Sequence, residues 1–83
     1  MTDAQLLRAA IDASGVVDPR TGLPSTRGVA LRILDLDDGT ARDVLAGNKQ
    51  LGRQSRVLCV LVAMRPDLVD VIEVAVAEAV ALR

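Results

Sequence analysis

The fold is decided by residues 27–68, which read RGVALRILDLDDGTARDVLAGNKQLGRQSRVLCVLVAMRPDL. Apolar side chains at helical spacing recur three times along this stretch. They predict three successive helices, over residues 26–35, 38–46 and 53–64. Asp37 or Asp38 can cap the second helix, and Gly47 lies where it should stop. Pro66 ends the third helix, because the residue before a proline is disfavoured in helical geometry.

One further helix is predicted on each side of this stretch. A capping box that begins at Thr2, followed by an apolar stripe, predicts a helix over residues 3–14. Residues 67–82 contain six β-branched side chains, which leave a strand as the alternative. When residues 67–82 are placed at 100° per residue, as in a helix, the acidic side chains gather on one side, so a helix is favoured. Residues 16–24 hold two prolines and predict a turn-rich connector. The sequence thus predicts an all-α fold, a compact five-helix domain over residues 1–83.

Composition argues against most classes of enzyme. The chain of 83 residues has no histidine, no aromatic residue and a single cysteine, Cys59. Without histidine, the side chain best suited to proton transfer near neutral pH is missing, and Cys59 has no partner that could activate it. One cysteine also excludes an intramolecular disulfide and a four-thiolate zinc site. We therefore expect no enzymatic activity and no cofactor, and we expect Cys59 to be a buried core thiol.

Nothing in the sequence points to export or to a membrane. The longest apolar run, residues 57–64, is far shorter than the roughly 20 residues that span a bilayer. The first residues have neither a basic start nor an apolar signal core. These features predict a cytoplasmic protein with no membrane partner. A domain of this size buries only about 60% of its unfolded surface, so a partner chain would add stability.

The stretch that decides the fold also resembles the helix-turn-helix domains of the lambda-repressor-like family, including its short repressor and antitoxin-type members. The likeness is carried by the order and spacing of five segments: Leu34-Asp35-Leu36-Asp37, Thr40-Ala41-Arg42, Val44-Leu45-Ala46-Gly47, Lys49-Gln50-Leu51-Gly52 and Arg65-Pro66-Asp67-Leu68. With the first helix it covers about Leu6 to Leu68. The chain departs from the family at Leu31, where a small residue is usual, and at Asp35, where a turn glycine is usual. Aspartate tolerates the left-handed backbone of such a turn at modest cost.

The resemblance implies a sequence-specific DNA-binding protein, a small transcriptional repressor that binds double-stranded DNA as a homodimer. The helix over residues 38–46 would enter the major groove and turn its exposed start toward the bases. There Arg42 could donate a pair of hydrogen bonds to guanine, and Thr40 suits a phosphate or a thymine methyl group. The candidate DNA-binding residues are Arg27, Gly39, Thr40, Arg42, Lys49, Gln50 and Arg53.

Local charge favours this interpretation. Between residues 39 and 65, five basic residues stand against Asp43 alone, a balance of +4, whereas residues 66–82 contain four acids and no base. A basic patch beside an acidic segment fits a molecule that turns one face toward phosphate. Asp37 and Asp38 act against it, because they place carboxylates at the start of the groove-facing helix.

Simpler roles compete for the same residues. Arg42 could pair with Asp38, four residues earlier, and the Thr40 hydroxyl could bond to a backbone carbonyl. The aspartates at 35, 37 and 38 resemble the start of a calcium loop. Gly39 comes one position early for such a loop, and the twelfth position holds alanine rather than glutamate. No metal site is therefore expected.

The last helix, within residues 66–83, is expected to mediate dimerisation. Its apolar arc is wider than the roughly 100° that a surface helix needs. Part of it could pack on the helices over residues 3–14 and 53–64, and part could meet a second copy. The candidate dimer-interface residues are Leu68, Val69, Ile72, Val76 and Val80. The alternative function is a protein-interaction module, an antitoxin subunit or adaptor, in which the same fold binds a partner protein rather than DNA.

Overall fold

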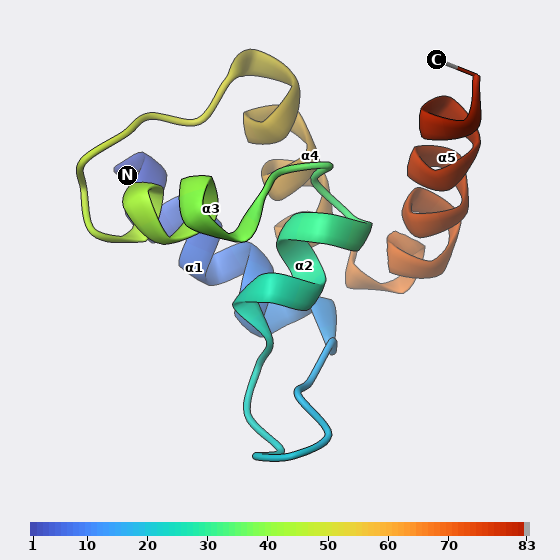
Figure 1. The fold of residues 1–83 in the computed structure, drawn as a ribbon, viewed down its shortest axis with the longest axis horizontal. Helices are drawn as coiled ribbons and strands as arrows, with labels where there is room; N and C mark the ends of the chain where they lie inside the picture. The colour runs from blue at the N-terminus through green and yellow to red at the C-terminus, as the bar shows by residue number, and fades with distance from the viewer. Residues whose placement is uncertain (83) are drawn as a thin grey trace.

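The computed structural model of the protein describes residues 1–82, and within them the chain forms five α-helices, one short 3₁₀ helix and no strand (Figure 1). This confirms the predicted all-α, five-helix fold. In chain order the elements are α1 (Asp3–Ser14), α2 (Thr26–Arg32), α3 (Asp38–Leu45), α4 (Arg53–Met64), the 3₁₀ helix η1 (Pro66–Leu68) and α5 (Val69–Ala81).

The helix ends follow the chemistry of their flanking residues. Thr2 and Gln5 form the predicted capping box: the Gln5 backbone N–H donates to the Thr2 hydroxyl at 3.1 Å, and the Thr2 N–H donates to the Gln5 side chain at 2.9 Å. Ser25 caps α2. Gly15 and Gly47 follow α1 and α3 with φ of 73° and 83°, the left-handed conformation that closes a helix.

Four boundaries differ from the prediction, two of them by a single residue: α3 ends at Leu45 rather than at residue 46, and α5 ends at Ala81 rather than at residue 82. α2 ends at Arg32 rather than at residue 35, because the next two backbone N–H groups both donate to the Val29 carbonyl and Asp35 then turns left-handed. The sequence predicts the last helix from residue 67, but Pro66–Leu68 form a 3₁₀ turn closed by a hydrogen bond of 3.0 Å to the Arg65 carbonyl. The α-helix itself begins after that turn.

The core is aliphatic and lies around α1, which packs mainly against α4 and α3. Leu7 and Ile11 of α1 are fully buried. The other buried apolar side chains are Ala10, Val29, Ala30, Ile33, Leu34, Ala41, Val44, Leu51, Cys59, Val62, Val69 and Ile72. Cys59 is therefore the predicted core thiol. In α2 the small Ala30 takes the buried position while its neighbour Leu31 is exposed, so Leu31 does not crowd the core.

The connector between α1 and α2 folds back on itself and projects from the helices, at the bottom of Figure 1. Val17 and Pro24 form an isolated antiparallel bridge, and the Asp18 N–H donates to a carbonyl across the loop at 2.9 Å. The loop base lies close to α2: a Cβ added at Gly28 would come within 2.8 Å of Val16 Cγ1. A glycine in α2 is therefore what allows the connector to approach.

α5 stands apart from the other helices, at the right of Figure 1. Its main helical neighbour is α2, whereas packing on α1 and α4 was expected from the sequence. Val69 and Ile72 are its only buried residues, and Arg32 of α2 pairs with Glu73 at 3.6 Å. Among the described helices, none has the length and apolar character needed to traverse a bilayer.

Candidate nucleic-acid interface

A tight turn joins α2 to α3 and sets the angle between them. Asp35 has φ of 51° and is the one non-glycine residue with positive φ in the described chain. Aspartate visits this region more readily than most residues because its short polar side chain can bond locally. The next N–H, of Leu36, donates to the Ala30 carbonyl at 2.8 Å and ties the turn back onto α2. α2 and α3 are therefore two short helices that pack against each other across a tight turn.

Asp37 fixes the start of α3. Its Oδ1 accepts the Thr40 backbone N–H at 2.7 Å, and its Oδ2 accepts the Thr40 hydroxyl at 2.9 Å. These two hydrogen bonds, with a smaller attraction from Lys49, hold the pKa of Asp37 below its ordinary value. The alternative of a hydrogen bond from the Thr40 hydroxyl to a backbone carbonyl is wrong, because the hydroxyl donates to the capping carboxylate instead.

Arg42 makes the ion pair that its spacing predicts. Its Nε donates to Asp38 Oδ2 at 2.9 Å, and its side chain remains 70% exposed. Within the described chain, the Nη groups of Arg42 make no hydrogen bond and stay available to a ligand. The second oxygen of Asp38, Oδ1, is buried and accepts no hydrogen bond there. The first turns of α3 thus present Gly39 and Arg42 to solvent, with Asp38 holding one edge of the guanidinium.

The remaining candidate residues occupy three places. Lys49 lies in the loop between α3 and α4 and approaches Asp43 Oδ2 at 3.6 Å. Gln50 is exposed in the same loop, and Arg53 is exposed at the first position of α4. Arg27 lines a hollow beside the connector instead. The fold thus gathers Lys49 and Gln50 in one loop and leaves Arg27 among connector residues.

Folding neutralises most of the basic patch that the sequence contains. Ion pairs within the chain hold four of its five basic residues: Arg42 with Asp38, Lys49 with Asp43, Arg56 with Asp3 and Arg65 with Asp67. In the described structure Arg53 is the member of the patch without an ion pair. The local balance of +4 therefore overstates the positive field of this face, because three of the neutralising acids, Asp3, Asp38 and Asp67, lie outside the residues counted.

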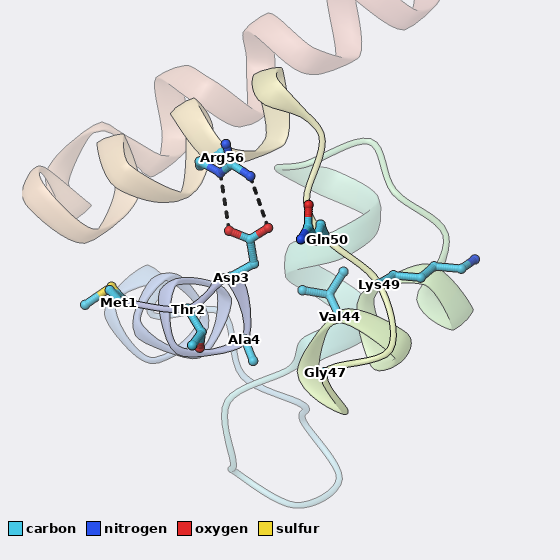
Figure 2. A pocket seen from close by; sticks show the side chains of 9 residues that line it. All are labelled: Met1, Thr2, Asp3, Ala4, Val44, Gly47, Lys49, Gln50 and Arg56. Carbon is cyan, nitrogen blue, oxygen red and sulfur yellow. Dashed lines mark hydrogen bonds and ion pairs between the residues drawn. The ribbon is translucent and has the colours of Figure 1, made fainter.

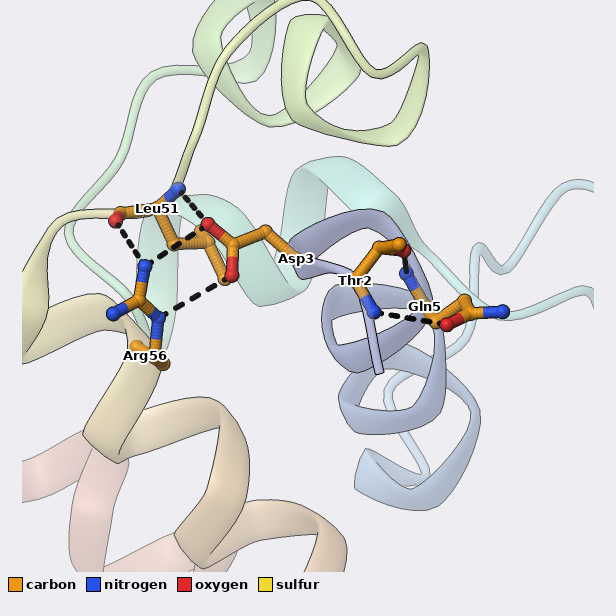
Figure 3. Close-up of polar contacts among 5 residues, drawn as sticks. All are labelled: Thr2, Asp3, Gln5, Leu51 and Arg56. Carbon is orange, nitrogen blue, oxygen red and sulfur yellow. Dashed lines mark hydrogen bonds and ion pairs between the residues drawn. The ribbon is translucent and has the colours of Figure 1, made fainter.

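A polar junction ties the first turn of α1 to the loop before α4 (Figure 3). Asp3 Oδ2 accepts the Leu51 backbone N–H at 2.8 Å, and Arg56 donates to the two Asp3 oxygens at 3.3 and 3.2 Å. Arg56 also donates to the Leu51 carbonyl at 3.4 Å. The hydrogen bond from Arg56, followed by that from Leu51, lowers the pKa of Asp3. We refer to Asp3, Leu51 and Arg56 as the Asp3 junction.

The Asp3 junction borders a hollow of about 470 Å³ between α1 and the loop that bears Lys49 and Gln50 (Figure 2). In Figure 2, Asp3 and Arg56 face each other, whereas Lys49 extends away from them. Arg56 is one of the five basic residues of the patch counted from the sequence, and its role in the Asp3 junction was not predicted. No local pattern could reveal it, because Asp3 lies 48 residues from Leu51 and 53 from Arg56.

The candidate dimer residues divide by burial. Val69 and Ile72 belong to the core of their own chain, with 6% of each residue exposed. Leu68 and Val76 are half-buried against that core, and Val80 is exposed. Within the folded chain, the part of this set that a second copy could contact is therefore small.

No set of three or more aspartate, glutamate or cysteine side chains in the described residues has the arrangement of a metal site. Comparisons of the chain with protein-family models, with curated proteins and with solved structures return no match.

Proposed function

We propose that the protein is a sequence-specific DNA-binding protein, a small cytoplasmic repressor of the lambda-repressor-like type that acts as a homodimer and has no enzymatic activity. The observation that supports this most directly is the α2–turn–α3 unit: two short packed helices, a left-handed Asp35 between them, and an exposed first turn on the second helix. A helix presented in this way fits the major groove with its N-terminal residues toward base edges.

Arg42 is the proposed base-reading residue. Its free Nη groups can reach the two acceptors of guanine while Nε keeps its hydrogen bond to Asp38, or the whole guanidinium can leave Asp38. A paired contact of this kind is worth about 1–3 kcal/mol of discrimination against the wrong base. Gly39 and Thr40 flank it, and Gly39 allows close approach because it has no side chain.

Lys49, Gln50 and Arg53 are the proposed phosphate contacts, with Arg27 as a more distant one. To bind phosphate, Lys49 must give up its 3.6 Å ion pair with Asp43. Both side chains of this pair are exposed to solvent, so breaking it costs little free energy. Arg53 has no ion pair to break within the described structure. With about three cationic contacts per protomer, the slope of log K against log salt should be near −3 for one bound protomer.

The test is fluorescence anisotropy with a duplex from the region upstream of the coding sequence and a scrambled duplex, over a salt series. We expect preference for the first duplex, with Arg42→Ala lowering that preference by about tenfold or more. Arg8→Ala removes the same charge from an exposed position on α1 and should leave the preference unchanged. Absence of binding to either duplex at low salt would overturn the proposal.

The second candidate function is a protein-interaction module. It is favoured by the ion pairs that neutralise the basic patch and by the exposed valines of α4 and α5. In that case the protein binds neither duplex at low salt, and substitutions of Arg42 and Lys49 leave its partner binding intact. Charged substitutions at the exposed Val71 and Val74 of α5 would instead abolish partner binding.

A further inference from the structure

The side of α4 that faces away from the core is apolar and exposed. Val57, Val60, Leu61 and Met64 occupy it at helical spacing, and we call these four residues the α4 outer face. Val57, Val60 and Met64 are 60%, 40% and 73% exposed, whereas Leu61 lies at the edge of this face and is half-buried, because part of it packs against the core. The α4 outer face and Arg56 line a hollow of about 370 Å³.

α4 is therefore apolar on two opposite sides. Its buried residues Ser55, Cys59 and Val62 face the core, and at 100° per residue the α4 outer face lies directly behind them. No charged residue occurs between positions 57 and 64. A helix that is apolar all round is typical of one that is covered on all sides. One side of α4 is thus left without a partner in the isolated chain.

The charges near the ends of α4 oppose its own dipole. Arg53 and Arg56 lie in the first turn, which holds no acid, and the last turn holds no base. Cations are favoured instead at a helix C-terminus. Asp67 follows the C-terminal end of α4 and is exposed, although it pairs with Arg65 at 2.8 Å. An antiparallel second α4 would bring its C-terminal end, and its Asp67, beside Arg53, which has no ion pair in the described chain.

We propose that the α4 outer face binds the same face of a second copy, with the two α4 helices antiparallel about a two-fold axis near Val60 and Leu61. Val57 of one copy then contacts Met64 of the other, and each Arg53 lies beside the opposite helix C-terminus, where this interaction competes with the phosphate contact proposed for Arg53. The contact is the same patch on both copies, as two-fold symmetry requires. This proposal deepens the proposed function, because it names the surface through which the homodimer forms. It rests on that function only in assuming that two copies are needed to read two half-sites of the DNA.

The outer side of α5 is a poorer candidate for self-association. Val71 and Val74 are exposed there, but Glu78 lies among them on the same side of the helix. Residues 66–82 contain four acids and no base, so two α5 helices would bring like charges together. Val71 therefore supplies a matched control for Val60: both are exposed valines, on two helices that are consecutive in the chain.

The proposed dimer is weak. Four side chains cover well under the roughly 800 Å² per partner of a standard interface. It should therefore form at high protein concentration, or when one DNA molecule holds two copies close together. Sedimentation equilibrium without DNA, from about 10 µM to about 1 mM protein, covers the range in which such an interface associates.

We expect association in that range, with Val60→Lys raising the dissociation constant about tenfold or more because a charge must be buried. Val71→Lys should leave it unchanged, with circular dichroism confirming that both variants fold. A monomer throughout the range, or loss of association in Val71→Lys alone, would overturn the proposal. Because no DNA is present, failure here leaves the DNA-binding proposal standing, and failure of DNA binding leaves this result unaffected.

Oxidative crosslinking tests the direction of the helices in a Cys59→Ser background. Val57→Cys and Met64→Cys proteins are mixed and oxidised. The antiparallel arrangement forms the mixed disulfide in preference to either symmetric one. Preference for the symmetric disulfides would indicate parallel helices, and no disulfide in any combination would indicate that the faces do not meet; both results contradict the proposal.

Discussion

Asp35 holds its backbone at φ of 51°, a conformation that costs an L-residue other than glycine roughly 1 kcal/mol. Asp35→Gly and Asp35→Ala both remove its carboxylate, and they differ only in the Cβ that causes strain at positive φ, so the difference between them isolates the backbone. We expect Asp35→Ala to be less stable than Asp35→Gly by about 1 kcal/mol in urea denaturation, because only glycine is free of strain there. Equal stabilities would mean that the turn does not require left-handed geometry.

Asp3 should make the stability of the protein depend on pH. Its pKa is lowered from 3.8 by Arg56 and Leu51, so the folded state holds the proton less tightly than the unfolded state does. The stabilisation is therefore complete above the unfolded value of about 3.8 and is lost as the pH falls through it and through the lower folded value.

We expect Asp3→Asn to lower the melting temperature by a few degrees at pH 7 and to have a smaller effect near pH 2. Asp12→Asn, an exposed position on the same helix, is the control and should melt like the wild type at pH 7. An Asp3→Asn defect of the same size at both pH values would show that the ion pair does not stabilise the fold.

The acidic residues in and before the first turn of α3 have opposite effects on helix stability and on DNA binding. Asp37 and Asp38 favour the helix, because anionic groups stabilise a helix N-terminus, but they disfavour an approaching phosphate backbone. If the DNA-binding proposal holds, Asp38→Asn should strengthen binding several-fold at low salt, since it frees Arg42 and removes a negative charge. Anisotropy measures this, with Asp12→Asn as the distant control for the same change in net charge. Unchanged affinity would indicate that α3 does not face DNA.

The helices themselves could be predicted from the sequence because local chemistry determines them. The capping box at Thr2, the cap at Asp37 and the stop at Gly47 depend on residues within one turn, and all three are confirmed. The end of α2 and the start of α5 were harder to predict from the sequence, because backbone hydrogen bonds around Asp35 and a 3₁₀ turn at Pro66 determine them.

The candidate site shows the same division between local and distant contacts. The pair between Arg42 and Asp38 follows from a spacing of four residues on a helix. The pairing of Arg56 with Asp3 depends on how α1 docks against α4, which periodicity does not encode. The basic patch was therefore overestimated from the sequence, because its charge was counted without the acids that tertiary packing brings to it.

For the molecule as a whole, Cys59 reports on global unfolding. It is the single thiol of the chain, it is fully buried, and burial raises its pKa to about 11. We expect a thiol reagent at pH 8 to modify it only when the core opens, so that labelling accelerates with urea in step with the loss of helical signal. Rapid labelling of protein with full helical signal would mean that α4 leaves the core on its own.

The Asp3 junction sets an order of assembly. Its partners enter the chain 48 and 53 residues after Asp3, so during synthesis the first turn of α1 exists long before anything can dock on it. Contacts between such distant residues carry a larger loop-closure cost than contacts within a helix, so we expect them to close after the local helices have formed. The loop that bears Lys49 and Gln50 is fastened at Leu51 by this late contact. The surface proposed to touch DNA is thus completed last, and its amides should be the first to exchange with deuterium when the protein is warmed.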